Sequence, residues 1–201
     1  MNVPTTSRAG ASCGALFAIV LFVASGNGNE SFLAPRAVAG LAALTLFVPF
    51  LAYLYSLLRA AEGPNGWLAP TALAGGVTGI TLKIVSIIPE LALHRAHVAD
   101  GTELHRLGQS LADGATVIAL FPLAVFCAAT AFVAFRTSVL PTWLAAFAAL
   151  TAGALAVNGA FLEASFVPAL LLFIAWTLVA GVHLLVRAWR RPATAARVAE
   201  A

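Results

Sequence analysis

The sequence predicts an all-α fold, a polytopic membrane protein built as a bundle of six transmembrane helices with both termini in the cytoplasm. Three observations predict it. The 201-residue chain is 61% hydrophobic and only 9% charged, whereas an ordinary soluble domain carries about 25% charged residues. Its mean hydropathy is +0.96. Six apolar segments also reach or approach the length of about 20 residues that a helix needs to cross a bilayer.

The six predicted helices cover about residues 10–25, 37–58, 68–93, 108–135, 140–157 and 165–186. Residues 26–29, 63–66 and 158–159, which are rich in Gly, Asn and Pro, separate several of them, because these residue types favour turns. Most connections are short, so neighbouring helices are expected to pack antiparallel. We predict one transmembrane domain over residues 1–191 and a short cytoplasmic tail over residues 192–201.

Proline inside the predicted helices indicates kinks. Each proline lacks a backbone donor and clashes with the preceding turn, and in a membrane the freed carbonyl needs a partner inside the bundle. The prolines concerned are Pro49, Pro89, Pro122 and Pro168.

Two pairs of glycines are spaced four residues apart, Gly10 with Gly14 and Gly75 with Gly79. This spacing puts both glycines of a pair on one helix face and permits close approach of a second helix. Packing within the chain is the first interpretation, and a homo-oligomer through these small-residue faces is the alternative.

Basic residues give the bundle an orientation. With six crossings both termini share one side, and that side carries seven arginines against three on the other, which places it in the cytoplasm. Trp67, Trp143 and Trp189 fall at the same boundary, as in an interfacial aromatic belt. A single lysine and abundant Ala and Gly are typical of GC-rich bacterial genes, so we predict a multi-pass protein of the bacterial plasma membrane. The seven arginines are Arg8, Arg59, Arg136, Arg187, Arg190, Arg191 and Arg197, and the other three are Arg36, Arg95 and Arg106.

The few charged residues within the predicted helices are the candidate functional residues. A charge at the bilayer centre costs about 2.5–3.5 kcal/mol on insertion scales and is usually directed into the bundle. The predicted topology gathers these charges in the outer half of the membrane, with Ser86 beside the kink expected at Pro89. The candidate ligand-binding residues are Lys83, Ser86, Glu90, Asp113 and Glu163.

Lys83 allows several interpretations. It pairs with Asp113 or Glu90, or extends toward the outer interface, in a structural role. Alternatively it lines a polar cavity, open to the outside, that binds an ion, a proton or a small ligand. Covalent chemistry at a buried lysine is a third interpretation, but a retinal-type protein would carry that lysine on a seventh helix.

Other classes of site lack their motifs. His94, His97 and His105 lie in the polar loop before residue 108 without a complete metal-ligand pattern, so a solvated loop is expected and no metal site or cofactor is predicted. Cys13 and Cys127 fall in apolar segments and are expected to pack as small hydrophobes. The net charge of +3 gives no support for nucleic-acid binding. Membrane lipids are the expected partners.

Three stretches resemble a family of proteins. They are Ile80-Thr81-Leu82-Lys83-Ile84-Val85-Ser86 with Pro89, the Leu-Tyr-Ser-Leu-Leu-Arg sequence that ends at Arg59, and Arg136-Thr137-Ser138-Val139-Leu140-Pro141-Thr142-Trp143-Leu144. They resemble small uncharacterised bacterial membrane proteins, common in actinobacteria and grouped as a domain of unknown function with about six helices. The resemblance covers most of the chain and implies the architecture, but no activity.

The predicted function is binding or translocation of a small solute or ion through an outward-facing polar pocket around Lys83. One alternative is a membrane-embedded enzyme that uses Glu90 or Asp113 to protonate a lipid or isoprenoid substrate. Another alternative is an accessory or structural subunit of a membrane complex. No catalytic residue is assigned, because no phosphate loop, Ser-His-Asp arrangement or HExxH sequence occurs.

Overall fold

The structure is a computed structural model, and it describes residues 3–26, 33–161 and 167–190. Within these ranges the chain is helical and has no strand. The helices are α1 (Val3–Gly26), α2 (Leu33–Glu62), α3 (Leu68–Val85), α4 (Ile87–Arg95), α5 (Glu103–Thr137), α6 (Thr142–Ala160) and α7 (Val167–Arg190).

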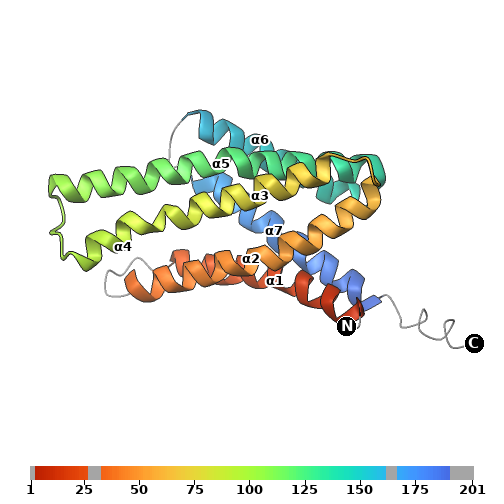
Figure 1. Cartoon of the computed structure of the whole chain (residues 1–201), viewed down its shortest axis with the longest axis horizontal. Coiled ribbons are helices and arrows are strands. Elements are labelled where there is room, and N and C mark those ends of the chain that lie inside the picture. The colour runs from red at the N-terminus through yellow and green to blue at the C-terminus, as the bar shows by residue number, and fades with distance from the viewer. Residues whose placement is uncertain (1–2, 27–32, 162–166, 191–201) are drawn as a thin grey trace, which may run out of the picture.

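The helices form an elongated bundle with two different ends (Figure 1). The start of α1, the end of α7 and the α2–α3 and α5–α6 turns lie at one end, which we name the termini end. The loop of residues 96–102 between α4 and α5 lies at the opposite end, which we name the hairpin end. The Arg8 guanidinium lies 4.7 Å from the ring centroid of Trp189, which joins the start of α1 to the end of α7.

Five stretches of helix are long and apolar enough to cross a membrane. The apolar stretch described in α1, Arg8–Ala24, is shorter, so its crossing stays a prediction. The 35 residues of α5 span about 52 Å at about 1.5 Å per residue, well beyond the roughly 30 Å of a bilayer core. The five stretches are Ala37–Glu62, Leu68–Arg95, Glu103–Thr137, Thr142–Ala160 and Pro168–Arg190.

The third predicted helix is two helices in the structure. α3 ends at Val85 and α4 begins at Ile87, with the buried Ser86 between them. Pro89 explains the break, because proline has no N–H to donate to the carbonyl four residues earlier, that of Val85. The kink predicted at Pro89 is confirmed.

Several helix ends differ from those predicted. α5 begins at Glu103 instead of residue 108, because the Thr102 side chain caps it by accepting a hydrogen bond from the His105 N–H at 3.2 Å. α6 begins at Thr142 instead of residue 140, because Pro141 occupies the position before the first turn. α1, α2 and α7 each extend several residues beyond the predicted ranges toward the termini end.

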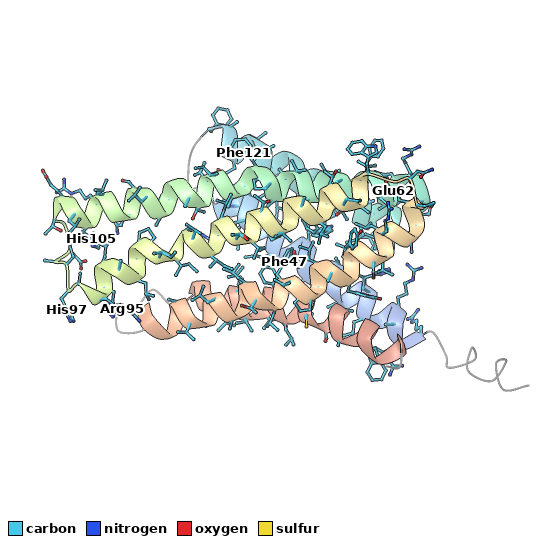
Figure 2. The ribbon with its side chains drawn as sticks, viewed as in Figure 1. Phe47, Glu62, Arg95, His97, His105 and Phe121 are labelled. Atoms are coloured by element: carbon cyan, nitrogen blue, oxygen red, sulfur yellow. The ribbon has the colours of Figure 1, made fainter. Side chains whose placement is uncertain are left out.

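Aromatic side chains fill the middle of the bundle. Phe47 of α2 packs on Phe17 of α1 and on Phe126 of α5, with ring centroids 5.0 and 5.8 Å apart. Phe173 and Trp176 of α7 complete the cluster, and all five side chains are buried. Phe47 lies between the two ends of the bundle in Figure 2. The cluster therefore joins four helices at mid-length.

The close packing predicted at the paired glycines is confirmed within the chain. A Cβ atom at Gly75 would lie 2.7 Å from the carbonyl oxygen of Pro122, and one at Gly79 would lie 2.6 Å from the Leu123 side chain. Gly10 faces Tyr53 of α2 in the same way. α3 therefore packs on the backbone of α5, and α1 on α2.

We predict that Gly75→Ala lowers the free energy of unfolding by about 1–3 kcal/mol, because the new methyl group meets backbone atoms that cannot rotate away. Gly153→Ala is the matched control, since no atom lies within 4 Å of its added Cβ, and we expect it to be neutral or stabilising by up to about 1 kcal/mol. Unfolding of both variants in detergent micelles measures the difference. Equal stability of the two would contradict the close α3–α5 packing.

Candidate functional site

Lys83 makes one hydrogen bond, to a neutral partner. Its Nζ donates to Oγ1 of Thr116 on α5 at 2.9 Å, and that hydroxyl donates in turn to the carbonyl oxygen of Ala112 at 3.0 Å. Among the described residues no carboxylate oxygen lies within 4.0 Å of the amine. Glu90 and Asp113 attract the amine only at longer range. The predicted contact pair between Lys83 and a carboxylate is therefore not formed, and Thr116 takes its place.

A cavity of about 730 Å³ extends from Lys83 to the hairpin end. The eleven residues from Lys83 to His94 rise about 16 Å along the helix axis, which gives the cavity its depth. Its polar wall comes from α3, α4, α5 and their connecting loop, and its apolar wall comes from α1 and α2. The polar wall contains Lys83, Glu90, His94, His97, Asp100, His105 and Gln109, and the apolar wall includes Leu21, Ala24, Ala37 and Gly40.

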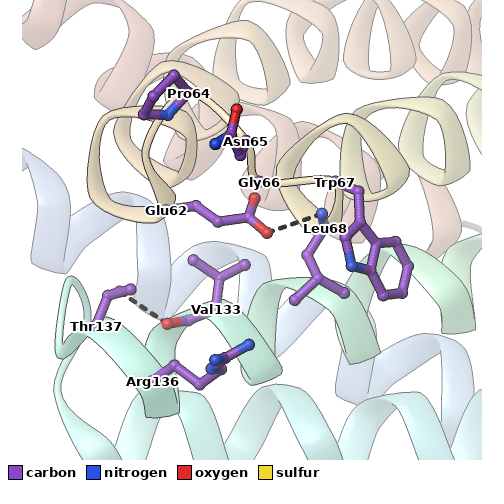
Figure 3. A pocket seen from close by; sticks show the side chains of 9 residues that line it. All are labelled: Glu62, Pro64, Asn65, Gly66, Trp67, Leu68, Val133, Arg136 and Thr137. Atoms are coloured by element: carbon purple, nitrogen blue, oxygen red, sulfur yellow. Dashed lines mark hydrogen bonds between the residues drawn. The ribbon is translucent and has the colours of Figure 1, made fainter.

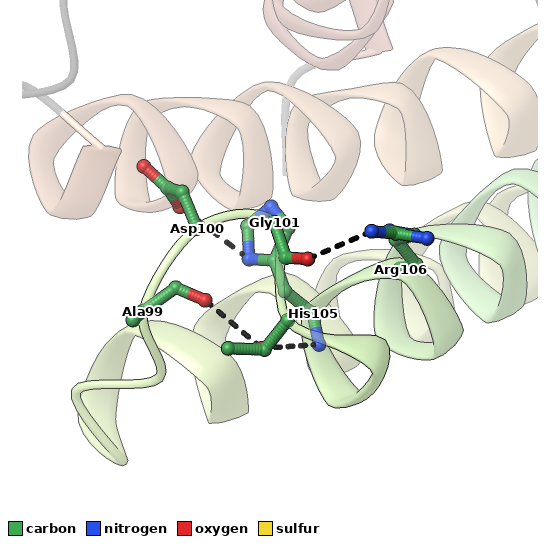
Figure 4. Close-up of polar contacts among 6 residues, drawn as sticks. Ala99, Asp100, Gly101, His105 and Arg106 are labelled. Carbon is green, nitrogen blue, oxygen red and sulfur yellow. Dashed lines mark hydrogen bonds and ion pairs between the residues drawn. The ribbon is translucent and has the colours of Figure 1, made fainter.

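The loop at the hairpin end is held in shape by local polar contacts (Figure 4). His105 Nδ1 lies 3.5 Å from Asp100 Oδ1. The Thr102 hydroxyl donates to the carbonyl oxygen of Ala99 at 2.9 Å, and Arg106 Nη2 donates to the carbonyl oxygen of Gly101 at 3.0 Å. Gly101 has a φ of +78°, a conformation that glycine adopts without strain. These contacts fix His105 in the cavity wall.

The face of the α4–α5 hairpin opposite the cavity is apolar and exposed. Ile88, Leu104, Leu107 and Leu111 are each 58–59% exposed. An apolar groove of about 270 Å³ runs between the two helices on this face, past Leu93 and Gly108. In this hairpin the polar side chains line the cavity and the leucines face outward. A soluble helix hairpin has the opposite arrangement, so this one suits contact with lipid.

The structure treats the five predicted site residues differently. Lys83 and Glu90 both line the cavity. Ser86 is buried, and its hydroxyl donates to the carbonyl oxygen of Lys83 at 2.7 Å, so it satisfies the broken helix end instead of facing the cavity. Asp113 is exposed and is not part of the cavity wall. Glu163 lies outside the described residues.

Sequence analysis missed Thr116 and Gln109, and it assigned the three loop histidines to solvent. A signal for Thr116 was present: Lys83 and Thr116 lie almost equally far along the chain from Asp100, and antiparallel helices bring such positions level with each other. In the part of the chain that the structure describes, no three His, Cys, Asp or Glu side chains gather as metal ligands.

Helix composition and the cavity define the class: an all-α protein with the features of a multi-pass membrane protein and a polar cavity opening at one end. Comparison of the chain with protein-family models, with curated proteins and with solved structures finds no match. The resemblance to a six-helix bacterial family stays a prediction.

We predict that Lys83→Met raises the free energy of unfolding by about 1 kcal/mol. A charged amine within a membrane-spanning helix costs up to about 2.5–3.5 kcal/mol, and one hydrogen bond to a charged group, worth roughly 1.5–3 kcal/mol, offsets this only in part. Thr116→Val is the matched variant, and we expect it to lose about 1–3 kcal/mol because it leaves the amine without its acceptor. Unfolding in micelles compares the two. A loss of stability in Lys83→Met as large as that in Thr116→Val would mean that the lysine has only a structural role.

Proposed function

We propose that the chain crosses the bacterial plasma membrane six times and binds, or translocates, a small polar solute or ion through the cavity around Lys83. The observation that carries the proposal is an amine that lines a cavity of about 730 Å³ and has, among the described residues, one neutral hydrogen-bond partner. A carboxylate in contact with Lys83 would neutralise its charge, and no carboxylate of the described ranges lies within 4.0 Å. The positive charge facing the cavity suits a ligand that brings a negative or polar group.

Orientation of the bundle rests on the arginines and tryptophans. Arg59, Arg136, Arg187 and Arg190 lie at the termini end together with three exposed tryptophans, whereas Arg95 and Arg106 lie at the hairpin end. The excess of arginine supports a cytoplasmic termini end. In this orientation the cavity opens to the outside of the cell. The tryptophans are Trp67, Trp143 and Trp189.

A polar ligand is favoured over a lipid because the cavity wall that contains Lys83 also carries two carboxylates and three histidines. An enzyme acting on a lipid or isoprenoid through Glu90 or Asp113 would need these acids in an apolar chamber, and an accessory subunit needs no cavity. Both alternatives, and a homo-oligomer through small-residue helix faces, therefore have less support than a solute site.

In this conformation a solute enters the cavity from the hairpin end. Gly75 packs at the level of Phe126, which belongs to the aromatic cluster, and Lys83 lies eight residues further along the helix, or about 12 Å nearer the hairpin end. The bundle below the cavity is thus filled by buried aromatic rings. Translocation requires these rings to separate in a second conformation.

We predict that a cysteine at position 83 is reached by water from the outer face. In a Cys13→Ala/Cys127→Ala background, Lys83→Cys should react with a charged, membrane-impermeant methanethiosulfonate added to intact cells. Ile80→Cys is the matched control, because Ile80 is one turn inward and only 5% exposed, and we expect no reaction there. Mass spectrometry of the purified chain measures the labelled fraction.

Two results would contradict the proposal. Absence of labelling at Lys83→Cys in both intact and opened cells would rule out a water-filled cavity. Labelling only after the cells are opened would reverse the orientation and place the cavity mouth in the cytoplasm.

A further inference from the structure

A second cavity, of about 500 Å³, lies at the termini end, between the α2–α3 turn and the last turn of α5 (Figure 3). Its charged residues are Glu62 at the end of α2 and Arg136 near the end of α5. Trp67 stands on its α3 side and is 68% exposed. This cavity is separate from the one that contains Lys83, and we name it the interfacial cleft. It is lined by Glu62, Pro64, Asn65, Gly66, Trp67, Leu68, Val133, Arg136 and Thr137.

One wall of the interfacial cleft is a rigid turn. Arg59 donates from Nη1 to the carbonyl oxygen of Gly66 at 2.5 Å and from Nη2 to that of Pro64 at 2.6 Å. The two carboxylate oxygens of Glu62 accept from the backbone N–H groups of Leu68 and Ala69, at 2.9 and 2.8 Å. The first turn of α3 therefore holds an ionised carboxylate in place. Each carboxylate oxygen keeps a further lone pair for a donor in the cleft.

The opposite wall presents a guanidinium group. Arg136 is exposed, and its guanidinium lies 5.7 Å from the ring centroid of Phe132 on its own helix. Arg136 and Glu62 line the same cleft, yet their charged atoms are more than 4.0 Å apart, and within the described ranges Arg136 makes no ion pair. The cleft thus holds opposite charges on two walls that do not pair with each other.

A ligand that carries both signs matches this arrangement. Arginine presents a planar set of donors suited to phosphate, and the Glu62 carboxylate suits a primary ammonium group with N–H donors. A purely anionic ligand would place charge beside Glu62, and a trimethylammonium group has no N–H to donate. Exposed Trp67 places the cleft at the depth of lipid headgroups, where tryptophan gathers in membrane proteins.

We propose that the interfacial cleft binds a phosphoethanolamine group, with the phosphate on Arg136 and the ammonium on Glu62, and that its source is the headgroup of an aminophospholipid. The proposal uses the membrane placement given above but does not depend on the Lys83 cavity. Free phosphoethanolamine has the same chemistry, so the test includes it as a separate arm.

The full chain, purified in detergent, is exposed to equal amounts of phosphatidylethanolamine, phosphatidylglycerol and phosphatidylcholine, and retained lipid is measured by native mass spectrometry. We expect phosphatidylethanolamine to be retained preferentially, and Arg136→Gln to reduce its retention about tenfold, as for loss of a charged hydrogen-bond partner. Arg190→Gln is the matched control, an exposed arginine of the same end outside the cleft, and should retain the lipid as the parent chain does.

A further variant assigns the contacts. Glu62→Gln should abolish the preference for phosphatidylethanolamine over phosphatidylglycerol, while Arg190→Gln should leave it unchanged. Melting temperatures of all variants are measured in parallel, so that loss of lipid is scored only for folded protein. Soluble phosphoethanolamine should fail to displace the lipid, because it lacks the acyl chains that anchor the headgroup.

Several outcomes would overturn the proposal. Equal retention of phosphatidylglycerol would leave a simple anion site and remove the role of Glu62. Unchanged retention in Arg136→Gln, or an equal loss in Arg190→Gln, would place the lipid elsewhere on the molecule. Complete displacement by soluble phosphoethanolamine would make the free molecule the ligand. None of these results bears on whether water reaches Lys83, so the two sites fail or stand separately.

Discussion

Gly75 and Gly79 let α3 lie directly on the backbone of α5, and this contact sets the register between the two helices. A Cβ atom at Gly75 would meet the Pro122 carbonyl oxygen at 2.7 Å, so a larger residue would force the helices apart. One turn beyond Gly79, the same register brings the Lys83 amine to the Thr116 hydroxyl at 2.9 Å. The hydrogen bond between Lys83 and Thr116 therefore depends on two glycines, Gly75 and Gly79.

The interruption of the helix at Ser86 determines which side chains face the cavity beyond Lys83. The hydroxyl of Ser86 donates a hydrogen bond to the carbonyl oxygen of Lys83. Pro89 has no N–H, so the carbonyl oxygen of Val85 lacks its usual helical donor. Beyond the break, α4 presents Glu90 and His94 to the cavity and Ile88 to the outside. Apart from Lys83, the polar wall thus lies beyond the point where the regular helix is interrupted. Backbone polar groups freed inside a membrane are tolerated where they lie against protein or water.

The position of a charged residue along its helix is easier to predict from sequence than the direction of its side chain. Counting residues grouped Lys83 with Glu90, and both line one cavity. Their depth in a membrane stays a prediction. Direction changes by about 100° per residue, so an error of one residue in register turns a side chain away from a cavity. Asp113 lies three residues before Thr116 and close to the same helix face. It is exposed outside the cavity wall, whereas the Thr116 hydroxyl contacts Lys83.

The solvent exposure predicted for the histidines is found for His94 and His97, but the place of all three histidines in a cavity wall was not predicted. His94, His97 and His105 were assigned to a solvated loop because the predicted helices ended at residue 93 and began again at residue 108. In the structure α4 continues to Arg95, and the cap at Thr102 starts α5 five residues earlier. His94 and His105 are therefore carried on helix ends, whereas His97 lies in the loop of residues 96–102, and all three line the cavity. Glu62 was overlooked likewise, because its role as acceptor for the first turn of α3 depends on the fold of the turn.

Among the described residues, the charged side chains of the two cavities lie toward the two ends of the bundle, with a layer of buried aromatic rings between them. Phe47, Phe126 and Trp176 occupy the middle, where a charge would be most costly. At the hairpin end the Lys83 amine faces a cavity of about 730 Å³, and no carboxylate of the described residues is in contact with it. At the termini end a carboxylate and a guanidinium face each other across a cleft without pairing. In both places a charged side chain makes hydrogen bonds within the protein but, among the described residues, has no oppositely charged partner in contact. At both ends the separation of the charges leaves a charged group free to meet a ligand of matching charge, which is the physical basis of both proposals.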